Sequence, residues 1–121
     1  MPTHNQIDLI EFRAADAATL AAARGFYESA FGWSFTDYGE YLDTPDSGVV
    51  AGINAVADDH QQQMPLTVLY VTDLEAARDL VAESGGRIIH DIYGFPGGRR
   101  FHFADPAGNE LAAWSDGAPP S

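Results

Sequence analysis

The chain has 121 residues, 18 of them acidic and 6 basic, which gives a formal net charge of -12. Every basic residue is an arginine and cysteine is absent, so the sequence excludes Schiff-base chemistry, a phosphate loop with its lysine, thiol nucleophiles, disulfides and thiolate metal sites. The negative charge disfavours nucleic acid and anionic membranes as partners.

The first half predicts a strand, a helix and three further strands. Residues 7–13 have strand character, and Asp16 is a good N-cap for an amphipathic helix that ends at Gly32. Short strands follow at 33–38 and 40–44, and after a turn another strand is expected at 49–55. The N-terminus has neither a basic start nor an apolar run, so we expect a cytoplasmic protein.

The same pattern begins again after a polar stretch at 57–65. Asp73 caps a second helix, and strands are expected around 66–71, 87–93, 99–103 and 109–114. The two caps lie 57 residues apart (73 minus 16). This offset predicts an α+β fold in one domain, 1–121, with tandem βαβββ modules at about 7–56 and 66–115 joined by the linker 57–65.

Two motifs carry a family resemblance. The segment FYESAFGW closes the first helix, and GGRRFHFADPAGNELAAWSD reads as a hairpin around a DPAGN turn. With the doubled module they resemble the vicinal oxygen chelate superfamily, which includes glyoxalases, bleomycin-resistance proteins and extradiol dioxygenases. The resemblance implies a curved mixed sheet that forms a cup, with helices on its outer face. It also implies a homodimer, with the cup formed within one chain or across two.

The resemblance further implies a divalent metal on ligands from four strands of the cup. Carried over by spacing, those four positions are Leu9, Gly52, Leu66 and Ala112. None of these side chains can bind a metal, so we expect no metal and no other cofactor. An unorthodox site built from His102, Glu110 and Glu11 stays open, because histidine with carboxylates suits zinc, iron or manganese.

Period-two alternation then predicts which side chains line the cup. Phe101 and Phe103 belong to the core face, which turns Arg100 and His102 the other way. Apolar walls with a few convergent polar groups are typical of small-molecule sites. The predicted ligand-binding residues are Leu9, Glu11, Arg13, Val68, Tyr70, Arg100, His102, Glu110 and Trp114.

Three functions remain open. The chain could bind a small apolar or aromatic molecule without turnover. It could instead be a lyase or isomerase in which His102 or Glu110 acts as acid or base, or an accessory module of a larger complex. His90 is expected to point away from the cup or to lie at an interface, the segment GFPGG at 94–98 to form a loop, and His4 and His60 to be exposed.

Overall fold

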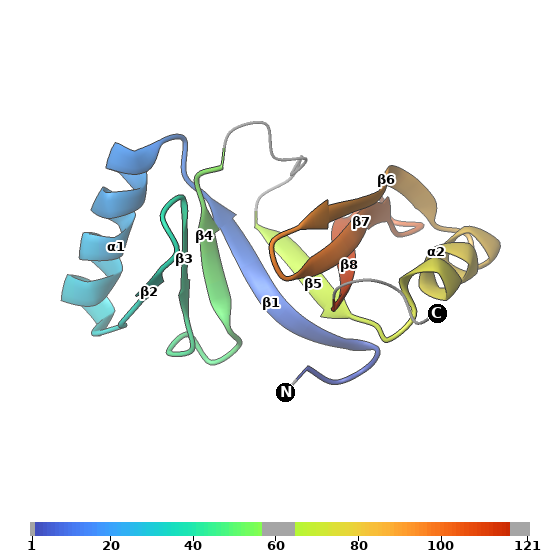
Figure 1. The fold of residues 1–121 in the computed structure, drawn as a ribbon, viewed down its shortest axis with the longest axis horizontal. Coiled ribbons are helices and arrows are strands. Elements are labelled where there is room, and N and C mark those ends of the chain that lie inside the picture. Colours follow the sequence, from blue (N-terminus) through green and yellow to red (C-terminus); the bar gives the residue numbers. More distant parts are fainter. Residues whose placement is uncertain (1, 57–64, 117–121) are drawn as a thin grey trace. The chain divides into compact units, whose positions relative to one another are not determined.

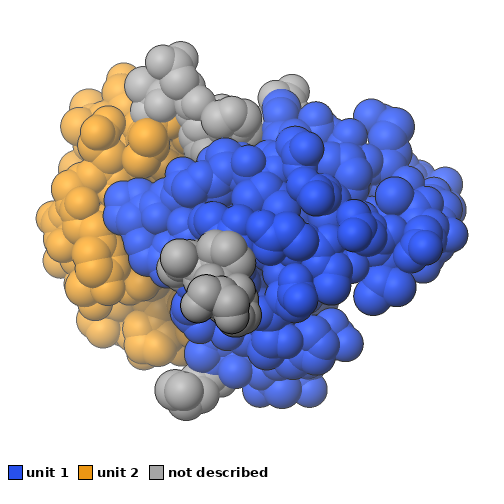
Figure 2. All heavy atoms as spheres, turned by 45° about the vertical axis from the view of Figure 1, so that its right-hand side comes forward, with its two compact units in different colours: residues 1–8, 67–121 blue, residues 9–66 orange. Residues whose placement is uncertain are grey.

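A computed structural model describes residues 2–56 and 65–116. The chain divides into two compact units, which Figure 2 colours separately: unit 1 comprises residues 1–8 and 67–121, and unit 2 comprises residues 9–66. Residues 57–64 of the predicted linker, including His60, lie outside the described residues.

The described residues of unit 2 form one helix on a four-stranded sheet. Its elements are β1 (Gln6–Arg13), whose first residues belong to unit 1, α1 (Ala17–Phe31), β2 (Thr36–Asp37), β3 (Tyr41–Thr44) and β4 (Ala51–Asn54). The strand order is β2-β3-β4-β1, and β1 runs parallel to β4. Leu20 of α1 packs on Leu42 and Ile53, which places one apolar core between helix and sheet.

The limits of α1 follow from its two end residues. Asp16 Oδ1 accepts a hydrogen bond from the Thr19 backbone N–H at 2.8 Å, and the Thr19 hydroxyl accepts one from the Asp16 N–H at 3.1 Å. This reciprocal capping box satisfies two backbone donors. At the other end Gly32 adopts φ +71°, a left-handed conformation that terminates the helix.

Unit 1 repeats the arrangement. It contains β5 (Leu66–Tyr70), whose first residue belongs to unit 2, α2 (Leu74–Glu83), β6 (Arg87–Phe95), β7 (Gly98–Ala104) and β8 (Glu110–Asp116), in the strand order β5-β8-β7-β6. Leu74 of α2 belongs to the same buried apolar cluster as Phe101 and Phe103 of β7. Figure 1 shows α2 beside strands β6–β8. The predicted α+β class with two tandem βαβββ modules is therefore confirmed.

The β7–β8 hairpin turns at the DPAGN motif. Asp105 Oδ1 accepts hydrogen bonds from the backbone N–H groups of Ala107 and Asn109, both at 2.9 Å, and Gly108 has φ +91°. Such an aspartate-centred turn sets the register of the two strands. Phe101 therefore lies opposite Ala113, and His102 lies opposite Ala112.

Strand β6 is longer than predicted and irregular. It continues to Phe95, and β7 begins at Gly98, so the expected GFPGG loop shrinks to Pro96 and Gly97. The register with β7 shifts between Ile88 and His90 and again between His90 and Tyr93. Each shift is typical of a β-bulge, which turns the following side chains to the other face of the sheet.

Within the described residues, neither helix is long and apolar enough to cross a membrane.

Candidate functional site

The unit 1 sheet has two chemically different faces. Leu111 and Ala113 join the phenylalanines of β7 under α2. Alternation turns Arg100, His102 and Glu110 to the opposite face, and all three are buried. A polar cluster thus lies on the face of β7 and β8 that α2 does not cover.

His102 is the centre of this cluster. Its side chain is 0% exposed, its Nδ1 lies 2.9 Å from Glu110 Oε2, and its Nε2 lies 2.6 Å from the Tyr93 hydroxyl. Both ring nitrogens are therefore engaged by neighbouring side chains.

The partners define where the protons lie. A Glu110 carboxylate only accepts hydrogen bonds, so Nδ1 carries the ring proton of a neutral His102 and Nε2 accepts from the Tyr93 hydroxyl. Burial lowers the pKa of His102 to about 4, against the opposing effect of the Glu110 hydrogen bond and with a smaller contribution from the Arg100 charge. A neutral imidazole is the form that this arrangement stabilises at neutral pH.

Arg100 adds a positive charge beside the imidazole. Its Nε donates to the Tyr93 hydroxyl oxygen at 2.6 Å. Its guanidinium carbon lies 5.6 Å from the Tyr93 ring centroid and 5.8 Å from that of Phe95, within the range of cation–π attraction. The hydrogen-bond chain runs Arg100, Tyr93, His102, Glu110.

Next to this chain the same face becomes aromatic. The rings of Tyr70 and Trp114 meet edge to face with centroids 5.1 Å apart, and Phe95 lies 6.2 Å from Trp114. All three rings are partly exposed. Gly98 permits this approach, because a Cβ there would overlap the Ser115 carbonyl oxygen and lie 3.2 Å from Trp114 Cε3 and 3.3 Å from Phe95 Cζ.

Unit 2 carries a smaller polar cluster on the face of its sheet opposite α1. Glu11 is 2% exposed and accepts from the Tyr41 hydroxyl at 3.0 Å and from Asn54 Nδ2 at 3.5 Å. Arg13, on the same strand, donates from Nη2 to the Val56 carbonyl at 2.6 Å. Gly52 makes room for Tyr41, whose hydroxyl would overlap any Cβ at that position.

The residues present do not fit the divalent metal that the family resemblance implies. Apolar side chains or glycine stand at Leu9, Gly52, Leu66 and Ala112. Across residues 2–56 and 65–116, no group of three or more His, Cys, Asp or Glu side chains could hold a metal ion. His102 and Glu110 form a pair in unit 1, and the described bonds of Glu11 are to Tyr41 and Asn54 in unit 2.

Sequence reasoning missed two members of the unit 1 cluster. The bulges in β6 place His90 opposite His102 and Tyr93 opposite Arg100, so both lie on the polar face. The expectation that His90 points away was therefore wrong: its ring lies 5.2 Å from that of His102. An even alternation through β6 cannot place both residues on one face, since 90 and 93 differ in parity.

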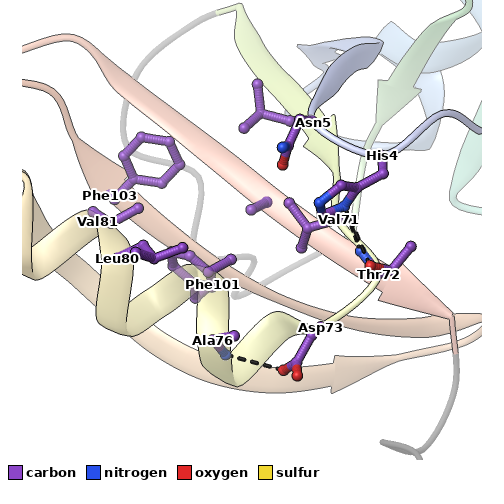
Figure 3. Close-up of a pocket in the computed structure, with 13 residues that line it drawn as sticks. His4, Asn5, Val71, Thr72, Asp73, Ala76, Leu80, Val81, Phe101 and Phe103 are labelled. Atoms are coloured by element: carbon purple, nitrogen blue, oxygen red, sulfur yellow. Dashed lines mark hydrogen bonds between the residues drawn. The ribbon is translucent and has the colours of Figure 1, made fainter.

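A cavity of about 340 Å³ lies on the other side of the unit 1 sheet, beneath α2 (Figure 3). Leu80, Val81 and Phe101 supply apolar walls, and His4 and Thr72 lie at its polar end. His4 is exposed as expected, and its Nδ1 accepts from the Thr72 N–H at 3.0 Å. The polar cluster faces away from this cavity.

A family model described as Glyoxalase/Bleomycin resistance protein/Dioxygenase superfamily matches residues 7–113. No curated protein matches the chain.

Solved structures share the fold at low sequence identity. A structure titled NAD-dependent benzaldehyde dehydrogenase from Legionella pneumophila has TM-score 0.73 and 13% identity, covering 90% of this chain and 98% of the other. Methylmalonyl-CoA epimerase from Mycobacterium tuberculosis has TM-score 0.68 and 13% identity, covering 98% and 92%. The Mn(II)-bound glyoxalase from Novosphingobium aromaticivorans has TM-score 0.61 and 17% identity, covering 100% and 43%. Such identities show the fold alone, and this fold serves several named activities.

Proposed function

Because the chain belongs to the Glyoxalase/Bleomycin resistance protein/Dioxygenase superfamily, we propose that it binds a small apolar or aromatic molecule on the face of the unit 1 sheet opposite α2. The ligand would lie against Tyr70, Phe95 and Trp114, beside the polar groups Arg100 and Tyr93. Part-exposed aromatic rings next to a few ordered polar groups are typical of small-molecule sites.

One observation supports binding over turnover. His102 is fully buried, and its two ring nitrogens already bond Glu110 and Tyr93. A general base must come within hydrogen-bond reach of the proton that it removes. In this state His102 holds Tyr93 in place instead of meeting a ligand.

The test is a ligand-observed NMR screen of small aromatic fragments, run with and without a metal chelator. Binding should persist with the chelator and should be lost in Trp114→Ala, whereas Trp33→Phe, which changes the other tryptophan in unit 2, should bind as the parent does. Fragment binding that disappears on chelation, or that survives in Trp114→Ala, contradicts the proposal.

A lyase or isomerase is the second candidate, and the chain from Tyr93 through His102 to Glu110 favours it. Such a chain can move a proton away from a hydroxyl in two steps, with the Arg100 cation stabilising the phenolate left behind. Catalysed exchange of α-protons of carbonyl compounds in deuterated water would report this activity. If the parent catalyses this exchange and both Tyr93→Phe and His102→Gln abolish it, the protein is an enzyme and the proposal of binding without turnover is wrong. An unorthodox metal site would instead make the exchange depend on added metal.

The proposal includes a cytoplasmic homodimer. Each module has a single helix to cover a two-sided sheet, and paired subunits are a common way to cover the other face. Light scattering at micromolar concentration should return twice the chain mass of 13.0 kDa. A particle of the single-chain mass would contradict the dimer, and recovery of the protein in a membrane or secreted fraction would contradict the location.

A further inference from the structure

One end of the unit 1 sheet carries two aromatic side chains whose polar atoms are both bonded to carboxylates. The Tyr70 hydroxyl donates to Asp116 Oδ2 at 2.7 Å, and Trp114 Nε1 donates to Asp8 Oδ2 at 2.9 Å. These bonds fix the two rings in their edge-to-face arrangement. The result is a rigid aromatic corner with an acid at each ring.

The carboxylates of Asp8 and Asp116 both place negative charge beside the Tyr70 and Trp114 rings. The pKa of Tyr70 is raised, first by its hydrogen bond to Asp116, then by burial, and also by the negative charges of Asp116 and Asp8. Tyr70 and Trp114 are partly exposed and Asp116 is exposed, so solvent reaches this corner. A negative potential therefore surrounds the ring edges.

Arg100 limits where a second positive charge can go. Its guanidinium lies over Tyr93 and Phe95, and Arg100 lies opposite Trp114 in the β7–β8 register. A ligand cation is repelled on that side of Trp114 and attracted on the Tyr70 side, where the carboxylates lie. The net charge of -12 draws cations toward the protein from a distance.

From this arrangement we propose that the ligand is an organic cation, an alkylammonium or quaternary ammonium compound, held against Tyr70 and Trp114 and neutralised by Asp8 and Asp116. Ring faces attract such cations through their quadrupoles, and the apolar substituents of the ammonium pack on the rings. This inference rests on the proposed function: it specifies the ligand class and confines a cationic ligand to the Tyr70 side of Trp114, away from Arg100.

The test compares choline with its neutral isostere 3,3-dimethylbutan-1-ol at low ionic strength. In a Trp33→Phe background Trp114 is the remaining tryptophan, so its fluorescence reports directly on the corner. Choline should bind at least about five-fold more tightly than the alcohol. The difference should shrink as salt is added, because salt screens the carboxylates.

Variants separate charge from shape. Asp8→Asn and Asp116→Asn keep an oxygen that can accept from Trp114 and Tyr70 but lose the charge, and together they should weaken choline binding about ten-fold while leaving the alcohol unchanged. Asp79→Asn is the matched control and should bind choline as the parent does, since Asp79 is exposed and lies on α2, which packs on the opposite face of the unit 1 sheet. Circular dichroism confirms that each variant is folded.

The outcomes distinguish this inference from the function on which it rests. If choline and the alcohol bind equally well, the proposal that the ligand is a cation is wrong, but small-molecule binding stands. The same conclusion follows if an aromatic fragment binds at Trp114 and choline does not. If neither these probes nor any fragment binds, the proposed function fails together with its ligand class.

Discussion

Acidification should destabilise this protein through a single buried histidine. The His102 pKa is lowered from 6.5 to about 4 by burial, whereas in the unfolded chain the ring returns to its ordinary value. Between these two values the unfolded state binds a proton that the folded state does not, so stability falls as the pH falls through this window. Above about pH 6.5 the ring is neutral in both states, so His102 no longer lowers the unfolding free energy.

The size follows from the two pKa values. Between about pH 7.5 and about pH 5 the folded protein should lose about 2 kcal/mol of unfolding free energy through His102. The variant His102→Gln keeps an amide donor and acceptor but cannot titrate, so it should lack this loss, whatever its stability at neutral pH. Carboxylates with lowered pKa, such as Asp105, titrate in both proteins and cancel in the comparison.

Urea unfolding followed by tryptophan fluorescence and by circular dichroism at both pH values measures the difference. Parallel pH dependences in the parent and in His102→Gln would show that His102 does not stay neutral in the folded state. The reasoning on its hydrogen bonds to Glu110 and Tyr93 would then be wrong.

Three further predictions concern the neighbourhood of the site and the core. Glu110→Gln should lower the pKa of His102 further, measured by NMR titration of the ring protons, because the carboxylate raises it; an increase would contradict the bond assignment. Phe101→Ala should lower the free energy of unfolding in urea by about 3–5 kcal/mol. The control Leu80→Ala, at an exposed helix position, should lower it by about 1 kcal/mol or less. Similar losses in the two variants would refute the packing of β7 under α2. Gly52→Ala should lower the melting temperature because its Cβ overlaps the Tyr41 hydroxyl, and equal stability would show that Tyr41 moves aside freely.

Local signals in the sequence were sufficient for the helices and for the repeat. The caps Asp16 and Asp73 begin α1 and α2 as predicted, because a short acidic side chain satisfies backbone donors wherever it precedes a helix. Alternation likewise placed Phe101 and Phe103 under α2. These features depend on residues close together in the chain.

The polar cluster could be predicted only in part. His102, Glu110 and Arg100 lie on regular strands, where period-two alternation holds, but Tyr93 lies beyond two bulges in β6. A bulge depends on how neighbouring strands pack, and nothing local in residues 87–95 signals it. The carboxylate bonds of Trp114 and Tyr70 escaped prediction for a related reason, since Asp8 and Trp114 are 106 residues apart.

We propose that a small molecule binds the unit 1 face opposite α2 without a metal. Two-dimensional NMR of the isotope-labelled protein, titrated with a screening hit or with choline in the presence of a chelator, tests it most directly. We expect the signals of the Trp114 indole N–H and of the backbone amides of β7 and β8 to shift together as ligand is added. Shifts confined to α2 and the cavity beneath it, or shifts that appear only when metal is restored, would contradict it.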